Sequence, residues 1–218
     1  MRKATRIMIS AMGAFVGLMG IEHGIGEVLQ GRRAPDGVFI LSWPESEFFR
    51  ILSGEPALTI LPDLFLTGIL AILFSLLYLL VSTLYVQNRK GSLILFLLAV
   101  GMLLFGGGIF PPLFGILIAA AATRVHVPLE DLHKYLSPRL VHVLGKFWPC
   151  SLVACLLAWL SMFPGIPLLN YIFGFDNELL IFGLLFCMIG FLFTSLIAAL
   201  ARDVENELFR QHLKSALL

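Results

Sequence analysis

The residues with the clearest capacity for chemistry lie in the segment Glu22-His23-Gly24-Ile25-Gly26-Glu27, near the end of the first apolar stretch. His23 precedes Glu27 by four residues, so on a helix the two side chains are neighbours on one face. Glu22 falls roughly on the opposite face of the same helix. An imidazole beside a carboxylate can bind a proton, a small cation or an amine. His23 and Glu27 are therefore the central pair of the candidate site.

Other polar residues are expected at the same level as His23. Asp63, directly after Pro62, is the third residue of the candidate ligand or cation site, although an acid in that position also suits the first turn of a helix. The same level is expected to hold four further polar residues, each with a simple structural explanation: Glu55, Asn170, Asp176 and Glu178.

Small residues form a stripe along the same first stretch. Gly13, Gly17, Gly20 and Gly24 recur at spacings of four, three and four, which places them on one face of a helix. Small residues on one face let a second helix approach closely, which favours association inside lipid. These four glycines are predicted to be helix-packing residues, and they carry no chemistry of their own.

Motifs of soluble enzymes are absent from the sequence. There is no His-Glu-x-x-His, Gly-x-Ser-x-Gly, Walker A or Gly-x-Gly-x-x-Gly pattern, so hydrolase, redox and nucleotide chemistry have no support. The three cysteines form no Cys-x-x-Cys pair, and the sequence predicts neither a metal centre nor a particular cofactor. The net charge of +1 gives no basis for binding nucleic acid.

The elements that must position these residues are set by composition. Of the 218 residues, 59% are hydrophobic and 13% are charged, and the mean hydropathy is +0.94. A soluble domain has about 25% charged residues, so this composition excludes a soluble or disordered protein. The sequence predicts an all-α, multi-pass bundle of transmembrane helices in contact with the lipid bilayer.

The spans follow from the apolar runs, one of which is interrupted. Residues 92–122 are too long for one crossing, and Gly106-Gly107-Gly108-Ile109-Phe110-Pro111-Pro112 lies in their middle. We therefore predict a tight hairpin there and six spans in one integral membrane domain covering residues 1–218, with five spans as the alternative. The predicted spans are 7–29, 57–86, 92–107, 110–124, 148–168 and 179–201.

Lysine and arginine counts favour six spans. With both termini cytoplasmic, 12 of these residues lie on the cytoplasmic side and 3 outside, whereas the best five-span arrangement gives 10 and 5. The first run lacks a small-residue cleavage site and is read as an uncleaved span. The absence of processing and glycosylation signals favours a bacterial inner membrane.

Three segments outside the spans are also expected to be helical. Ser42-Trp43-Pro44-Glu45 matches a capping box and predicts a short interfacial helix over 45–52. Pro128 and Ser137-Pro138 predict further short helices within 124–147. Residues 202–218 are expected to extend the last span into a charged cytoplasmic helix.

Three functional hypotheses remain open. The first is a small transporter or ligand- and cation-binding membrane protein that uses His23, Glu27 and Asp63 at an outward-facing site. The second is a structural or accessory subunit that binds a protein partner through the first span or the tail. The third is an intramembrane enzyme that uses His23 and Glu27 as a metal-ligand or acid–base pair.

Overall fold

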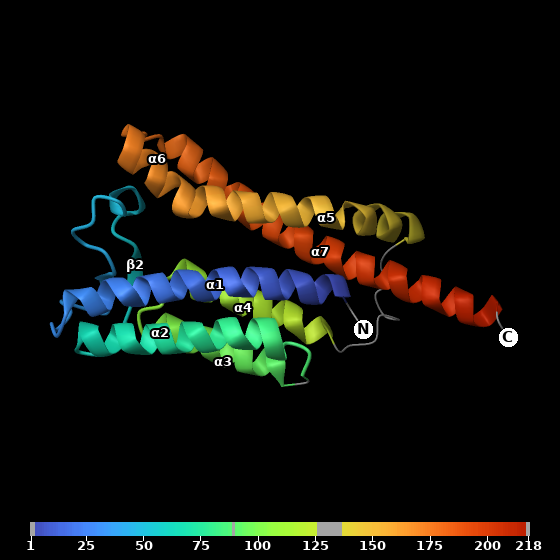
Figure 1. Cartoon of the computed structure of the whole chain (residues 1–218), viewed down its shortest axis with the longest axis horizontal. Helices are drawn as coiled ribbons and strands as arrows, with labels where there is room; N and C mark the ends of the chain where they lie inside the picture. Colours follow the sequence, from blue (N-terminus) through green and yellow to red (C-terminus); the bar gives the residue numbers. More distant parts are fainter. Residues whose placement is uncertain (1–2, 89, 126–136, 217–218) are drawn as a thin grey trace. The chain divides into compact units, whose positions relative to one another are not determined.

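The computed structural model describes residues 3–88, 90–125 and 137–216, and the chain is mostly helical (78%) (Figure 1). In chain order the elements are α1 (Lys3–Gln30), β1 (Phe39–Leu41), η1 (Arg50–Leu52), β2 (Pro56–Leu58), α2 (Leu64–Leu80), η2 (Val81–Tyr85), α3 (Gly91–Leu104), α4 (Phe110–Ala122), η3 (Thr123–Val125), α5 (Pro138–Leu160), η5 (Ser161–Gly165), α6 (Ile166–Phe173) and α7 (Glu178–Ala216).

The chain folds into two compact units. Unit 1 comprises Met1–Met8, Val125–Gly165 and Asn177–Leu218, and unit 2 comprises Ile9–Arg124 and Ile166–Asp176. Unit 2 contains most of α1 together with α2, α3, α4, α6 and both strands. Unit 1 is built on α5 and α7.

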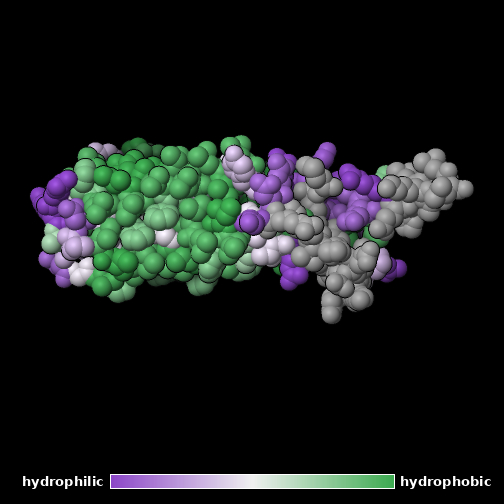
Figure 2. All heavy atoms as spheres, turned by 90° about the horizontal axis from the view of Figure 1, so that it is seen from below, coloured by the Kyte–Doolittle hydropathy of each residue, from purple (hydrophilic) through white to green (hydrophobic). Residues whose placement is uncertain are grey.

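Four helices of the described chain are long and apolar enough to cross a membrane. They run over Lys3–Gln30, Leu64–Tyr85, Pro138–Phe173 and Glu178–Arg210, where the third includes the kink at η5. Two shorter apolar helices, Gly91–Leu104 and Phe110–Val125, lie between them in sequence. Figure 2 shows a broad hydrophobic surface bordered by hydrophilic residues. Exposed leucine, isoleucine and phenylalanine side chains of α2 and α3 suit contact with lipid.

The glycine stripe of α1 lies against α2. A Cβ atom at Gly17 would come within 2.7 Å of Leu79 Cβ, and one at Gly24 would come within 2.7 Å of the Gly68 carbonyl oxygen. Gly13 and Gly20 lie equally close to serine side chains of α2 and η2. Glycines with higher residue numbers in α1 contact residues with lower numbers in α2 and η2, so the two helices are antiparallel. Glycine is needed because no side chain fits between the backbones.

The long third apolar run is broken where its glycines and prolines predict. α3 ends at Leu104 and α4 begins at Phe110, with Pro111 and Pro112 in its first turn, where missing N–H groups cost no helical hydrogen bond. Gly106 and Gly108 have φ of +85° and +82°. These are left-handed conformations that glycine adopts without strain.

A two-stranded sheet flanks residues 45–52, where the sequence predicts an interfacial helix. β1 and β2 are antiparallel with Phe39 opposite Leu58, and the pairing continues through Ser42 N–H to Glu55 O (2.9 Å). Because the pairing brings both ends of the intervening segment together, that segment must reverse direction. It does so through turns and the three-residue η1, so the prediction of a helix over 45–52 is wrong.

The α3–α4 turn extends this small sheet. The Gly106 N–H donates to Leu58 O (2.8 Å), and the Ile60 N–H donates to Leu104 O (3.2 Å). β2 is therefore hydrogen-bonded to β1 on one edge and to the turn on the other. The loop after α1 and the glycine turn consequently form one hydrogen-bonded layer.

In unit 1, α5 and α7 are longer than the predicted spans. The Ser137 hydroxyl caps α5 by accepting from Leu140 N–H (3.3 Å), and the helix then continues without a break into the apolar run. Residues 138–147 are thus part of α5, and the predicted span over 148–168 is interrupted by the kink at Phe163 and Pro164. The helix start predicted at Pro128 lies outside the described residues.

α7 carries the predicted tail helix as a direct continuation of its apolar part, as far as Ala216. Within this stretch Asp203 is buried, and its carboxylate accepts from Ala4 N–H (3.0 Å) and Thr5 N–H (2.9 Å) in the first turn of α1. A carboxylate at a helix N-terminus satisfies free donors and complements the helix dipole. The tail helix is thereby tied to the start of α1 within unit 1.

Candidate functional site

His23 and Glu27 lie on the last two turns of α1 within unit 2. His23 is 2% exposed and Glu27 is 0% exposed, although both are polar. Buried polar groups are costly unless they are hydrogen-bonded, so their partners define the site. Those partners come from the β1–β2 hairpin and from the glycine turn between α3 and α4.

One serine hydroxyl links the imidazole to the carboxylate. Ser42 Oγ lies 3.1 Å from His23 Nδ1 and donates to Glu27 Oε1 over 3.2 Å. Ser42 directly follows β1 and is fully buried, on the same face of the strand as Ile40. Its second contact, with His23, is made possible by the four-residue spacing that stacks the two α1 side chains.

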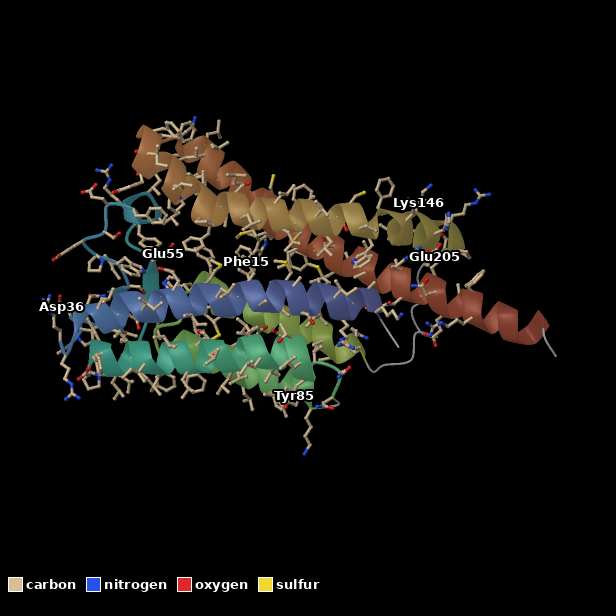
Figure 3. All side chains as sticks on the ribbon, in the orientation of Figure 1. Phe15, Asp36, Glu55, Tyr85, Lys146 and Glu205 are labelled. Atoms are coloured by element: carbon tan, nitrogen blue, oxygen red, sulfur yellow. The ribbon has the colours of Figure 1, made fainter. Side chains whose placement is uncertain are left out.

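Glu55 contacts the other side of the imidazole ring. Its Oε2 atom lies 3.5 Å from His23 Nε2, and its side chain is 12% exposed. Figure 3 labels Glu55 beside α1. Glu55 stands opposite Ser42 in the hairpin register, so the same pairing delivers both residues to His23. Burial raises the pKa of Glu55 from 4.5 to about 7.

The glycine turn covers the cluster from a third side. A Cβ atom at Gly106 would collide with Glu27 Oε2, and one at Gly108 would collide with His23 Nε2. Oε2 of Glu27 is buried and has no hydrogen-bond partner. The absence of side chains at this turn therefore lets its backbone close over the His23 and Glu27 head groups.

Carboxyl groups outnumber basic groups in this cluster. Glu22 lies close enough to both Glu27 and Glu55 for mutual electrostatic repulsion. The helical geometry of α1 alone puts Glu22 on the other face, but the hairpin folds over that part of the helix as well. Among the described contacts of Glu22, Glu27 and Glu55, no lysine or arginine forms an ion pair. The arrangement can accept a proton or another small cation.

The structure leaves Asp63 outside this cluster. Its carboxylate caps α2 by accepting from Leu66 N–H (3.0 Å), as an acid at that position does in many helices. No group of three or more His, Cys, Asp or Glu side chains in the described ranges is arranged to hold a metal ion. Among the other polar residues predicted at this level, Asn170 on α6 donates to Phe175 O (2.9 Å), just after the end of that helix.

A cavity of about 280 Å³ borders the cluster. Ser42 and Gly26 form part of its wall, and the remaining lining comes from the loop and the end of α1: Leu29, Gln30, Arg33, Trp43, Pro44, Glu45 and Ser46. The indole of Trp43 lies over Gly26 and stacks on Phe49, with ring centroids 5.0 Å apart. Of the cluster residues, Ser42 belongs to the lining of this cavity, and Ser42 is itself buried.

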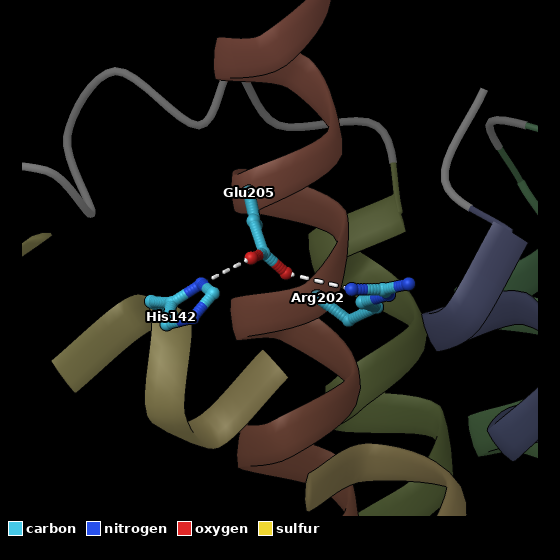
Figure 4. Close-up of polar contacts among 3 residues, drawn as sticks. All are labelled: His142, Arg202 and Glu205. Atoms are coloured by element: carbon cyan, nitrogen blue, oxygen red, sulfur yellow. Dashed lines mark hydrogen bonds and ion pairs between the residues drawn. The ribbon is translucent and has the colours of Figure 1, made fainter. Parts of the chain in front are cut away.

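A second polar group lies in unit 1 (Figure 4). Glu205 on α7 contacts His142 Nδ1 on α5 (2.7 Å) and Arg202 Nη1 (2.8 Å). Gly145 allows this close approach, because a Cβ atom there would lie 2.8 Å from Glu205 Oε2. The His142 side chain is 68% exposed, so the group is a surface link between α5 and α7.

Sequence reasoning identifies His23 and Glu27 by their helical spacing, but it misses Ser42 as a member of the site. The only sequence signal for Ser42 is its place in a hairpin, opposite Glu55, and that hairpin has strands of three residues. Comparison with known proteins adds no further member: no family model, curated protein or solved structure matches this chain.

Proposed function

We propose that this protein is a small multi-span membrane transporter whose cation site is the cluster of His23, Ser42, Glu27 and Glu55. One observation carries the proposal. A buried histidine and a buried glutamate share a single serine hydroxyl, while the second oxygen of Glu27 has no partner. Ionisable groups buried in a membrane span are costly, and they mark ion or proton pathways far more often than they serve packing.

The charge of the cluster favours a cation as its ligand. Glu22 lies within electrostatic range of both Glu27 and Glu55, and a bound cation or proton offsets negative charge on these three carboxyl groups. The lack of a three-ligand metal arrangement in the described part of the chain disfavours a divalent metal. Protons and small monovalent cations such as ammonium or sodium are the ligands that suit this site.

The proposed transporter has six crossings, with α3 and α4 as a short hairpin and both termini in the cytoplasm of a bacterial cell. The four long apolar helices and the break between Leu104 and Phe110 support this number. The cluster then lies at the outward-facing end of α1. Asp63 is left out of the site because its carboxylate caps α2.

The accessory-subunit hypothesis has less support. It used the glycine stripe of the first span as a partner surface, but α2 of the same chain occupies that stripe. The enzyme hypothesis needs a metal or a nucleophile next to His23, and among the described contacts only Ser42 carries a hydroxyl there. Ser42 donates to Glu27 rather than to the imidazole, which is the wrong direction for activation by a histidine base.

The test is thermal stability of the full-length protein in detergent, across about pH 5 to about pH 8, with sodium, potassium, ammonium, magnesium and calcium chlorides as probes. A cation present at about 100 times its dissociation constant stabilises the folded state by about 2.7 kcal/mol. For a chain of this length we expect the melting temperature to rise by roughly 5 °C or more. The response should disappear in His23→Ala and in Glu27→Gln.

Matched controls replace the same residue types far from the cluster. His142→Gln and Glu47→Gln change an exposed histidine and an exposed glutamate, and both should keep the wild-type response. A wild-type melting temperature that is insensitive to pH and to every salt would overturn the proposal. The same holds if His23→Ala and Glu27→Gln respond as the wild type does.

A further inference from the structure

We propose that Glu55, His23, Ser42 and Glu27 form a proton relay that carries a proton from the exposed edge of the cluster to the buried carboxylate of Glu27. This inference rests on the proposed cation site and specifies both its ligand and its route. Ser42 Oγ joins His23 to Glu27 through two hydrogen bonds, and Glu55 contacts the other ring nitrogen at ion-pair distance. Successive contacts are 3.5 Å from Glu55 Oε2 to His23 Nε2, 3.1 Å from His23 Nδ1 to Ser42 Oγ, and 3.2 Å from Ser42 Oγ to Glu27 Oε1.

The hydrogen-bond directions within this series follow from the protonation state of Glu27. While Glu27 is ionised, its carboxylate only accepts, so the Ser42 hydroxyl donates to it. The Ser42 hydroxyl has no second proton to donate to His23. The hydrogen bond between Ser42 and His23 therefore requires a proton on Nδ1. In the neutral imidazole this leaves a lone pair on Nε2, directed at Glu55.

A lone pair facing a carboxylate is repulsive unless one proton lies between them. The contact of His23 Nε2 with Glu55 Oε2 therefore calls for a proton on one of the two atoms. Burial raises the pKa of Glu55 to about 7, so that this residue gains and loses its proton close to neutral pH. It is also the most exposed of the four, and it is the point where a proton enters from water.

The transfer conserves every proton. The Glu55 O–H bond breaks as an N–H bond forms at His23 Nε2. The N–H bond at Nδ1 then breaks as its proton passes to Ser42 Oγ, and the former hydroxyl proton of Ser42 forms the new O–H bond at Glu27 Oε1. The net change is one proton moved from Glu55 to Glu27 and a switch of the imidazole from its Nδ1–H to its Nε2–H tautomer.

One further carboxyl group lies beside the relay. From α1, Glu22 interacts electrostatically with both Glu55 and Glu27. The α3–α4 turn contributes only the glycine backbone of residues 106–108, and α2 brings the uncharged Thr67 beside the turn. Glu27 is the final proton acceptor of the relay. Its Oε2 atom has no hydrogen-bond partner among the described side chains.

The test follows protonation of Glu27 after a rapid drop in pH, with the full-length protein in detergent and infrared detection of the protonated carboxyl group. The band of Glu27 is identified by its loss in Glu27→Gln. Ser42→Ala removes the only hydroxyl of the relay, and we expect it to slow protonation of Glu27 by at least about tenfold. Ser42→Thr restores a hydroxyl and should restore the rate, and Ser46→Ala serves as a matched control on the same loop.

A second measurement does not depend on the serine variants. Nitrogen-15 spectra of histidine-labelled protein report which ring nitrogen of His23 carries the proton, and the relay requires a switch from Nδ1–H to Nε2–H when Glu27 becomes protonated. An imidazole that keeps one tautomer through protonation of Glu27 would overturn the relay, as would a wild-type protonation rate in Ser42→Ala. If either result appears while the melting temperature still responds through His23, the cation site stands without the relay. If that response is also missing, both proposals fail.

Discussion

Glu55 combines an unfavourable backbone conformation with an unfavourable side-chain environment. Its φ of 57° is in the left-handed region, where a residue with a Cβ atom pays about 1 kcal/mol, and Ser53 has a similar φ of 56°. Its carboxyl group is largely removed from water beside His23. Strain of this kind persists only where the surrounding structure enforces it, and it concentrates at functional sites.

The stability of the protein should depend on pH through Glu55. Its pKa is about 7 in the folded protein and 4.5 without burial, so the folded state binds the proton more tightly than the unfolded state. The contribution is complete below about pH 4.5, decreases as the pH rises, and is lost above about pH 7. The change in unfolding free energy has an upper limit of about 3 kcal/mol.

Chemical denaturation at a series of pH values measures this contribution. Glu55→Gln has no proton to lose, so its stability should vary less between acid and neutral pH than that of the wild type. Glu47→Gln, on the exposed part of the same loop, should follow the wild type. Equal pH slopes for Glu55→Gln and the wild type would show that Glu55 is not the titrating group.

The helical spacing of four predicts the pairing of His23 with Glu27, because both residues belong to one helix. It cannot predict which loop covers that face, so the contacts of Ser42 with both residues are missed. The position of Asp63 in the sequence predicts its level along the bundle but not the direction of its side chain. Its carboxylate caps α2. The helical geometry of α1 alone places Glu22 away from the face of His23 and Glu27. Glu22 nevertheless interacts electrostatically with Glu55 of the hairpin.

Among the elements, the turn between α3 and α4 shows how backbone conformation and close packing combine. Gly106 needs glycine for two separate reasons, since it has a positive φ and lies directly against the carboxylate of Glu27. Gly31 has the same kind of φ (+78°) but open space around it, and Gly37 has neither constraint. A comparison of these three positions separates two contributions to the free energy of unfolding: the left-handed backbone conformation and the close contact with Glu27.

Alanine substitutions at these glycines should therefore have graded effects on stability. Gly37→Ala should be near neutral, and Gly31→Ala should cost about 1 kcal/mol for its left-handed backbone. Gly106→Ala should cost about 3 kcal/mol or more, because its methyl group also displaces Glu27. Unfolding in denaturant gives the three values, and equal losses at Gly31 and Gly106 would contradict close packing of the turn on Glu27.

The strongest element signals in the sequence come from residues that break helices. Gly106 to Gly108, followed by Pro111 and Pro112, predict where α3 ends and α4 begins. The β1–β2 hairpin gives no such signal, because strands of three residues are too short for a visible alternation. The capping-box pattern at Ser42 is misleading for a physical reason: its hydroxyl is engaged by Glu27 and His23 instead of a helix N-terminus.

At the scale of the whole molecule, the sequence predicts membrane insertion better than internal organisation. High hydropathy and long apolar runs predict the four long helices. The division into two compact units is not visible in composition, because both contain the same kind of apolar helix. A single integral domain over residues 1–218 and six crossings stay predictions.

Membrane topology can be tested at two positions of unit 2. Asp36 follows α1, Tyr85 ends η2 at the opposite end of the unit, and Asn88 comes shortly after Tyr85 (Figure 3). In a variant with Cys150, Cys155 and Cys187 replaced by alanine, we expect a membrane-impermeant maleimide to label Asp36→Cys from outside intact cells. Asn88→Cys should be labelled only after the cells are opened.

The orientation of the protein follows from the same experiment. Labelling of both positions from one side would contradict a crossing by α2. Labelling of Asn88→Cys alone from outside would reverse the proposed orientation. A further cysteine at the exposed residue Arg139, before the long part of α5, should behave like Asn88→Cys if α3 and α4 both cross.

The unequal lengths of α2 and α3 have a consequence for the surrounding lipid. Leu64–Tyr85 has 22 residues and extends about 33 Å, whereas α3 has 14 residues and extends about 21 Å. Both present exposed apolar side chains, so lipids beside them would meet two different hydrophobic heights. If α3 crosses the membrane as proposed, we expect acyl chains beside it to shorten or tilt to match it, so that bilayer thickness acts on the glycine turn and, through it, on the head groups of His23 and Glu27.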